Sequence, residues 1–167
     1  MKKNNDKLPI VLRGYVESDL VEISELFYNT VHGVCNKDYT KEQLKVWATG
    51  KIDKEAWNQS LKKHETMVAL INHKIVGFGD LDGAYLDRLY VHKDYQNRGI
   101  ATAIVNKLEQ LASDHKETSI TVHASITARP FFEKQGYTLV KEQQVERQGI
   151  LLTNYVMEKN LLHVIKA

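Results

Sequence analysis

Residues 84–113 combine a strand, a short polar loop and the strongest amphipathic helix of the chain, in direct succession. In the helix, apolar side chains recur at helical spacing, at Ile100, Ile104, Leu108 and Leu111. A strand that leads through a few residues into such a helix needs a sheet against which the helix can pack. This unit therefore restricts the fold to a layered arrangement of helices on a sheet.

The alternation of apolar residues breaks within this strand. Leu86 occupies an even position, whereas Leu89 and Val91 occupy odd ones, so a regular strand cannot turn all three to one face. One extra residue near Arg88 restores the phase, which predicts a β-bulge there. The alternative is a strand buried on both faces, which requires no alternation.

The rest of the chain alternates between strand and helix patterns, with no repeat and no linker. Strands are expected at 10–16, 66–71, 74–81, 119–124, 137–147 and 150–159, and helices after Ser18, Thr40 and Asp53 and across 127–135. Hairpin turns are expected at Asn72-His73 and Gln148-Gly149, and Gly136 is expected to end the last helix. The pattern indicates an α/β mixture whose sheet is largely antiparallel.

Composition favours an ordinary globular protein and excludes several functional classes. With 23 Lys plus Arg and 21 Asp plus Glu, the net charge of +2 is too small for a nucleic-acid binder. A single cysteine, Cys35, and seven histidines without an HExxH spacing predict no disulfide and no metal site. The polar start and the lack of a long apolar run predict a cytoplasmic protein that does not bind membranes. The 167 residues suit one domain, 10–167, after an N-terminal tail, 1–9.

The loop between the strand and the helix has the composition of a phosphate-binding site. It contains Gln96-x-x-Gly99-x-Ala101, in which small residues let a ligand approach the backbone. Unpaired N–H groups and the positive end of the helix dipole meet there, which favours a pyrophosphate. The alternative is a glycine that only opens a packed helix. A dinucleotide site is disfavoured because GxGxxG is absent.

A second segment, Ser125 to Tyr137, contains a short helix with Pro130 near its start and a glycine-aromatic exit. Together with residues 86–101 it resembles the two coenzyme motifs of the GNAT superfamily of acyl-CoA-dependent N-acyltransferases, and is nearest to small bacterial acetyltransferases. The order of elements fits from Ile10 to Lys159. The resemblance implies a three-layer α/β (α+β) fold with a mixed, mostly antiparallel sheet of about seven strands, a bulged and splayed fourth strand, and flanking helices.

The resemblance also implies acetyl-CoA as the cosubstrate, with no metal. The backbones of Leu89 and Val91 are then expected to bond the pantetheine arm as an added strand does, and the amides from Arg98 to Thr102 to hold the pyrophosphate. The coenzyme-binding residues implied in this way are Leu89, Tyr90, Val91, Gln96, Asn97, Arg98, Gly99, Ile100, Ala101, Thr102, Ser125, Phe131, Phe132 and Lys134.

The reaction implied is direct transfer of the acetyl group from the thioester to a primary amine of a small molecule or a protein. An N–H freed by the bulge near Leu89 is the expected donor to the oxyanion. The candidates for the base are Asp87, Tyr85, His123 and Glu142, although an ion pair with Arg88 and a surface histidine are simpler explanations of Asp87 and His123.

Many GNAT enzymes protonate the departing thiolate with a tyrosine four residues before the glycine of the second motif. Here that position holds Phe132, which has no proton to give. The alternatives are water, another tyrosine (Tyr137, Tyr155 or Tyr85), or a protein that binds acyl-CoA as a sensor or accessory module without turnover. An acyl-carrying role for Cys35 is disfavoured because no base arrangement surrounds it. The catalytic residues expected are Leu89, Asp87 and Tyr155.

The acceptor pocket of the family is built from the first helices and the last hairpin. In this chain that places Tyr28, His32, Tyr85, Asp87 and Tyr155 in the pocket, near Tyr39 and Arg147, with Phe27 and Trp47 in the core. The acceptor itself is left open among antibiotics, polyamines, amino acids and protein amino groups. A monomer or a homodimer is expected, the latter through an edge strand at 150–159.

Overall fold

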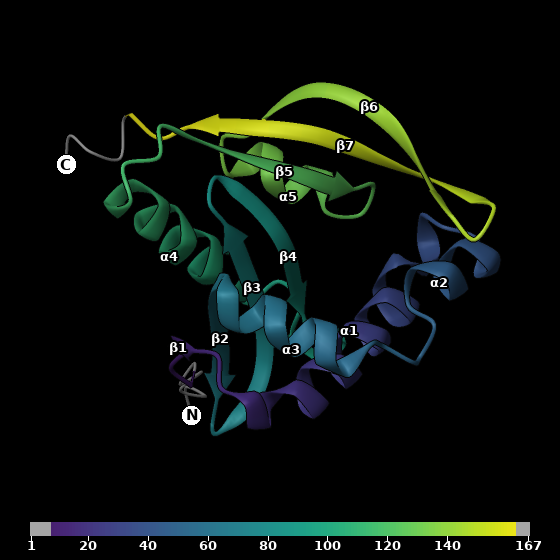
Figure 1. Ribbon diagram of the computed structural model, residues 1–167, viewed down its shortest axis with the longest axis horizontal. Coiled ribbons are helices and arrows are strands. Elements are labelled where there is room, and N and C mark those ends of the chain that lie inside the picture. The colour runs from purple at the N-terminus through teal and green to yellow at the C-terminus, as the bar shows by residue number, and fades with distance from the viewer. Residues whose placement is uncertain (1–7, 163–167) are drawn as a thin grey trace, which may run out of the picture.

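The computed structural model describes residues 8–162 and places one twisted sheet at the centre of the molecule (Figure 1). Most of the expected tail, 1–9, lies outside this range. The strands are β1 (Val11–Gly14), β2 (Glu65–Ile71), β3 (Lys74–Asp82), β4 (Tyr85–Val91), β5 (Ser119–Ser125), β6 (Thr138–Arg147) and β7 (Ile150–Asn160). The helices are α1 (Leu20–Val34), α2 (Lys41–Trp47), α3 (Lys54–Lys63), α4 (Ile100–Asp114) and α5 (Arg129–Lys134), with 3-10 turns η1 (Glu17–Asp19), η2 (Cys35–Lys37) and η3 (Lys93–Tyr95). None of the described helices has both the length and the apolar character that crossing a membrane requires.

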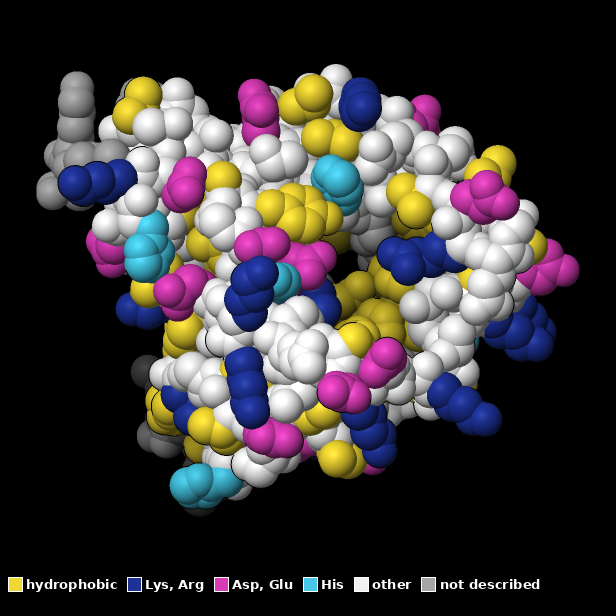
Figure 2. Space-filling view, viewed as in Figure 1, with side chains coloured by type: hydrophobic (Ala, Val, Ile, Leu, Met, Phe, Trp, Pro, Cys, Tyr) yellow, Lys and Arg dark blue, Asp and Glu magenta, His cyan; other side chains and the backbone are white. Residues whose placement is uncertain are grey.

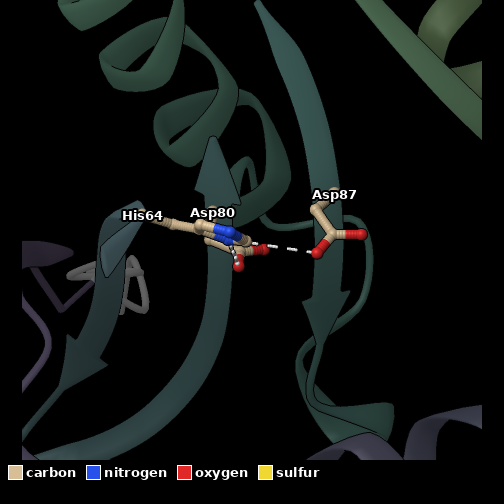
Figure 3. A group of neighbouring side chains, drawn as sticks. All are labelled: His64, Asp80 and Asp87. Atoms are coloured by element: carbon tan, nitrogen blue, oxygen red, sulfur yellow. Dashed lines mark hydrogen bonds and ion pairs between the residues drawn. The ribbon is translucent and has the colours of Figure 1, made fainter. Parts of the chain in front are cut away.

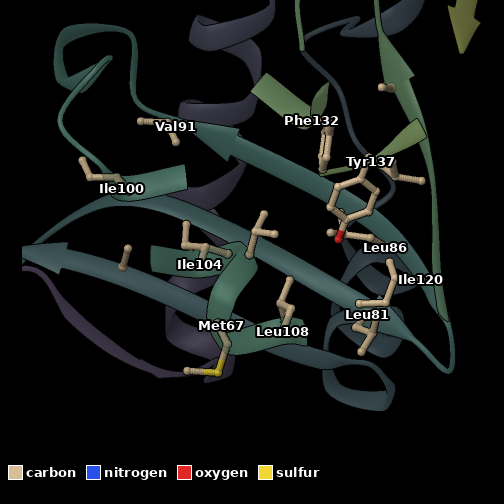
Figure 4. Close-up of a cluster of buried hydrophobic side chains, with 14 of the residues drawn as sticks. Met67, Leu81, Leu86, Val91, Ile100, Ile104, Leu108, Ile120, Phe132 and Tyr137 are labelled. Atoms are coloured by element: carbon tan, nitrogen blue, oxygen red, sulfur yellow. The ribbon is translucent and has the colours of Figure 1, made fainter. Parts of the chain in front are cut away.

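Helices cover both faces of this sheet, so the expected three layers are confirmed. On one face, α4 sets Ile104 and Leu108 against β2, β3 and β4, in the larger of two apolar cores (Figure 4). On the other face, α1 sets Ile23 and Val31 against β3 and β4, and Phe78 of β3 completes the second core. Each helix has an apolar stripe that is removed from water when the helix packs on the sheet. This burial stabilises the two segments as helices.

Local signals in the sequence account for most of the element boundaries. Thr40 and Gln43 form the reciprocal hydrogen bonds of a capping box, and Asp53 caps α3 through the N–H of Ala56. Ser18, however, does not begin a helix as expected. The chain forms η1 first, because the carboxylate of Asp19 accepts the N–H of Val16 at 3.0 Å and binds Arg13.

The β-bulge on β4 is confirmed. Asp80 of β3 lies opposite Arg88, and the next residue, Leu81, lies opposite Leu86, so Asp87 is the extra residue on β4. The bulge returns Leu86, Leu89 and Val91 to one core, whereas Asp87 is exposed. A strand buried on both faces is therefore excluded.

The sheet divides immediately after the bulge begins. The seven strands have the order β1-β2-β3-β4-β5-β7-β6, and every neighbouring pair is antiparallel except β4 and β5. This parallel pair has only two matched positions, Tyr85 with Thr121 and Leu86 with Val122. Beyond them β4 and β5 diverge, as Figure 1 shows, and the expected splay is confirmed.

The expectation that residues 150–159 form an edge strand is wrong. β7 pairs with β5 from Ser119–Asn160 to Ser125–Asn154 and with β6 on its other side, so it is an interior strand. The edges of the described sheet are β1 and β6. A dimer that extends the sheet would therefore have to use one of those two strands.

Gly79 on β3 lies where α4 comes closest to the sheet. A Cβ atom there would stand 2.9 Å from Cγ2 of Ile104 and 3.1 Å from the carbonyl oxygen of Arg88. The backbone of β4 can move away from this Cβ only at an energetic cost. We therefore expect Gly79→Ala to lower the free energy of unfolding by about 2 kcal/mol in urea titrations. Gly14→Ala is the control, since its Cβ meets nothing within 4 Å. Equal midpoints for the two variants would contradict this packing argument.

Candidate active site

A cleft of about 930 Å³ opens where β4 and β5 diverge. Its walls come from these two strands, the loop before α4, the start of α5, the β6–β7 hairpin and the region from the end of α1 to α2. Figure 2 shows a hollow on this face with apolar side chains on its floor and charged side chains around its rim. The cleft therefore joins the strand–loop–helix segment 86–101 and the segment Ser125 to Tyr137.

The expected coenzyme residues gather along this cleft. Its lining contains Leu89, Tyr90, Val91, Gln96, Asn97, Gly99, Ile100, Ala101, Thr102, Ser125, Phe131, Phe132 and Lys134. Arg98 is the one member of the expected set outside the lining, and its guanidinium carbon lies 4.9 Å from the centre of the Tyr95 ring. Ile100 and Phe132 are 1% and 2% exposed, so these two offer little more than their edges and backbone.

The loop before α4 has the geometry of an anion site. Gly99 is the N-cap of α4 with a φ of 80°, in the left-handed region that favours glycine, and a Cβ there would meet nothing within 4 Å. The side-chain amide of Gln96 donates to the carbonyl of Val91 at 2.7 Å and so ties the loop to the end of β4. The N–H groups of the first helical turn thus face open space with the helix dipole behind them.

A buried carboxylate closes the bulge on β4 (Figure 3). Asp80 is 0% exposed, and its Oδ1 accepts the backbone N–H of Arg88 at 2.9 Å. Its Oδ2 accepts from the guanidinium of Arg88 and lies 2.8 Å from Nδ1 of His64. Arg88 also donates to Oγ of Ser60 at 2.8 Å and lies over the ring of Trp57. The side chains thereby supply the bonds that the irregular ladder leaves out.

This network changes the interpretation of Asp87. The expected ion pair between Asp87 and Arg88 is present but long, with 3.9 Å between Oδ2 of Asp87 and a guanidinium nitrogen, because Asp80 takes the closer position on that guanidinium. Asp87 lies at the same 3.9 Å from Nδ1 of His64, and its side chain remains 33% exposed in the cleft. Asp87 is therefore a carboxylate that lies beside two basic groups without a close hydrogen bond to either of them.

His64, Asp80 and Asp87 also have the donor types of a metal site, with ligand atoms within 4.8 Å of one another. The guanidinium of Arg88 already bonds Oδ2 of Asp80, and its charge opposes a divalent cation at that position. Burial raises the pKa of the Asp80 carboxyl, and the nearby Arg88 and His64 act against that shift. The arrangement favours an ionic network rather than a metal centre.

Tyr85 and Asp87 are the expected pocket residues that line the cleft, and Tyr85 meets His123 edge to face at 5.1 Å between ring centres. Trp47, assigned to the core, packs there and also lines the cleft. Burial raises the pKa of the Tyr85 phenol, which keeps it protonated near neutral pH.

Tyr28, His32 and Tyr155 lie outside the cleft lining. Tyr28 and His32 stack on each other at 4.3 Å away from the packed stripe of α1, and Nε2 of His32 donates to the carbonyl of Ala48 at 2.8 Å. Tyr155 packs near α5, with the guanidinium of Arg129 lying 4.4 Å from its ring centre. The spacing of four residues predicts that Tyr28 and His32 lie together on α1, but it does not specify whether their face of the helix points into the cleft.

The structure also shows which of the other candidate proton donors for the thiolate reach the cleft. Phe132 packs between Phe131 and Tyr137, and the hydroxyl of Tyr137 donates to Glu109 at 3.0 Å inside the core. Of the three tyrosines considered, Tyr85 alone lines the cleft. Cys35 also reaches the cleft, but burial raises the pKa of its thiol, so it stays neutral and poorly nucleophilic.

Sequence reasoning missed the part played by His64, Asp80 and Arg88. One signal was present: Asp80 stands in the otherwise apolar run of β3, where an unpaired charge would be too costly to keep. The network could not be read from the sequence, because His64 reaches Asp80, and Ser60 reaches Arg88, only through the packing of α3.

Asp80→Asn should destabilise the fold, because an amide NH₂ would face the guanidinium of Arg88 and leave that charge without its partner. We expect the free energy of unfolding to fall by about 3 kcal/mol in urea titrations. Asp94→Asn, at a side chain that is 68% exposed, provides the same chemical change as a control and should leave the midpoint unchanged. Unchanged stability of the Asp80 variant would show that the network does not hold the bulge.

Comparisons with known proteins agree with this geometry. The model of the "Acetyltransferase (GNAT) domain" family matches residues 35–159. The uncharacterized N-acetyltransferase YafP of Escherichia coli (strain K12) is 36% identical over 154 residues, which cover 92% of this chain and 98% of that protein.

Solved structures give the same result for the fold. The crystal structure of a GCN5-related N-acetyltransferase ("Aminotransferase, Class-II") from Rhodopseudomonas palustris is 32% identical, with a TM-score of 0.87 over 90% of this chain and 94% of that one. PaiA N-acetyltransferase from Thermoplasma acidophilum, solved in complex with coenzyme A, shares the fold at 17% identity, with a TM-score of 0.75 over 92% of this chain and 99% of that one. From the extent of the family match and the identity to YafP, this chain belongs to the GNAT acetyltransferase family and is an acyltransferase.

Proposed function

We propose that the protein is an acetyl-CoA-dependent N-acetyltransferase that transfers the acetyl group to a primary amine by direct attack. The observation that carries the proposal is the continuity of the cleft, which runs from the anion site before α4 to the carboxylate of Asp87. A relative of the same fold, PaiA, was solved with coenzyme A, which supports a related ligand here. The lone, buried cysteine supports action in a reducing compartment such as the cytoplasm.

The coenzyme would lie along the edge of β4 that β5 has left. The amides from Gly99 to Thr102 would hold the pyrophosphate, and the pantetheine arm would pair with the backbone of β4 as an added strand. The carbonyl of Val91 already accepts from Gln96 and from Oγ1 of Thr30, at 2.7 and 2.9 Å, which uses both of its lone pairs. We therefore assign the arm chiefly to the backbone of Leu89.

The chemistry follows from the groups at the bulge. Asp87 would take a proton from the acceptor ammonium, and the neutral amine would attack the thioester carbon. The C–N bond forms first and gives a tetrahedral intermediate, whose oxyanion an N–H near Leu89 would stabilise. The C–S bond then breaks, and the nitrogen loses its second proton to water, which balances the proton that the thiolate takes up. The thiolate would take its proton from water or from Tyr85, the tyrosine of the three considered that lines the cleft.

A second candidate function is an acyl-CoA sensor or accessory module without turnover. It is favoured by one observation, the buried phenylalanine at the position where many family members carry a proton-donating tyrosine. Thiolate release does not require a strong acid, because a thiol has a pKa of about 8.5. For this reason the enzyme remains the better proposal.

Calorimetry with acetyl-CoA and a thiol-release assay over a panel of primary amines test the two functions together. Saturable binding with turnover of any amine supports the enzyme and refutes the sensor. Binding without turnover of any amine supports the sensor. The absence of binding by folded protein overturns both.

Gly99→Val should weaken acetyl-CoA binding by at least about tenfold, because the side chain would enter the space assigned to the phosphates and strain a left-handed residue. Gly83→Val is a matched control, since Gly83 has a φ of 61°, open space around its Cβ and no place in the cleft lining. Calorimetry compares the two Kd values. Equal losses of affinity would assign the effect to backbone strain instead of the coenzyme site.

Asp87→Asn should lower kcat/KM for the amine by about a hundredfold, because the amide cannot accept the proton of the acceptor. The Kd for acetyl-CoA and the thermal midpoint should not change, since the side chain is partly exposed and makes no close hydrogen bond to Arg88. Asp82→Asn is the control, because Asp82 is 61% exposed and outside the cleft lining. A parental rate in the Asp87 variant would remove this residue as the base.

A further inference from the structure

We propose that the acceptor is a small primary amine that also carries a carboxylate, as amino acids do. This inference rests on the proposed function and specifies the substrate class of the same cleft. It starts from two opposite charges that line the cleft and have no role assigned in coenzyme binding, Asp87 on β4 and Arg147 at the end of β6. A dipolar ligand would have its amine at Asp87 and its carboxylate at Arg147.

Arg147 is exposed, lines the cleft and has a guanidinium without a protein partner. Three other arginines are each paired with a carboxylate, Arg13 with Asp19, Arg88 with Asp80 and Arg129 with Glu133. Within residues 8–162, Arg147 forms no ion pair and no hydrogen bond, although Glu146 precedes it. A guanidinium fork binds a carboxylate through two parallel hydrogen bonds, which suits it to an anionic ligand group in this position.

Both charges act on the same tyrosine. Tyr85 lines the cleft, and its pKa is raised first by burial, then by the carboxylates of Asp87 and Asp80, while Arg147 lowers it. Asp87 and Arg147 line the same cleft as this tyrosine. The paired rings of Tyr85 and His123 form the wall beside them.

The β6–β7 hairpin offers a second unpaired polar group to a ligand. Asn154 on β7 lines the cleft, and its Oδ1 is buried without a hydrogen-bond partner. A buried acceptor left unpaired costs free energy, which a donor on a bound molecule would recover. Thus Arg147 and Asn154 of the hairpin give the cleft a cation and an acceptor, whereas Asp87 of β4 supplies the anion.

The sign of each charge selects among acceptors. A polyamine or a polycationic antibiotic would gain from Asp87 but would be repelled by Arg147 and by Lys37, which also lines the cleft. An amine bearing only an apolar chain would leave Arg147 unpaired. An amine with a carboxylate satisfies both ends at once and is oriented by them, with the nitrogen toward the bulge where the thioester is expected.

The test compares amines that differ only in the carboxylate, lysine with 1,5-diaminopentane and 4-aminobutyrate with propylamine. We expect the carboxylated member of at least one pair to have a kcat/KM at least about tenfold higher, as a charged hydrogen-bonded pair should give. Arg147→Gln should remove that preference and leave the KM for acetyl-CoA unchanged. Lys141→Gln, which removes one positive charge from the same strand outside the cleft lining, should keep the preference.

Calorimetry can measure the binding of the same four amines to protein saturated with coenzyme A, and this readout does not require turnover. Tighter binding of a carboxylated amine that is lost in Arg147→Gln supports the inference. Equal or better binding and turnover of the decarboxylated partners overturns it, and so does failure of both carboxylated amines in both assays. Failure of acetyl-CoA itself to bind would instead overturn the proposed function.

Discussion

The cleft depends on how the buried carboxylate of Asp80 is satisfied. A bulge leaves a backbone N–H without its partner strand, and such a group is costly away from water. Asp80 accepts that N–H from Arg88 and pairs with the guanidinium of the same residue, so one side chain compensates for both the irregular ladder and the buried cation. His64 and Ser60 complete the set of bonds from α3. The bulge is thus part of a closed network and not a local defect.

The position of the bulge determines what the sheet can do next. β4 and β5 pair only at Tyr85 and Leu86, the two residues before the bulge, and diverge after it. The divergence exposes an edge of β4 inside the molecule, next to the start of α4 with its unpaired N–H groups. Edge and helix start together would suit an extended chain with an anionic end, such as the coenzyme A of the proposed function. Asp87, the extra residue, comes to lie where that chain would end.

Much of this arrangement is visible in the sequence, but only where the signal is local. The phase of Leu86, Leu89 and Val91 predicts the bulge, and the small residues around Gly99 predict the anion site. By contrast, the partners of Asp80 depend on how α3 packs, and the order of the last two strands depends on which one meets β5. The sequence pattern of a hairpin specifies its turn but not which of its two strands pairs with the rest of the sheet. For this reason the sequence does not show that β7 lies between β5 and β6. Periodicity likewise groups Tyr28 with His32 without indicating that their face of α1 points away from the cleft.

The distribution of charge explains why the small net charge of the chain is uninformative about its ligand. In the proposed function the phosphates would meet the positive end of the α4 dipole, and Arg98 lies outside the lining, over Tyr95. Asp80 is paired within its network, so Asp87 is the carboxylate that lines the cleft, as Arg147 also does. Asp87 is only loosely paired, and Arg147 has no partner within residues 8–162, so these opposite charges cancel in the sum but not in space. Their separation, and not the total, is what a dipolar acceptor would recognise.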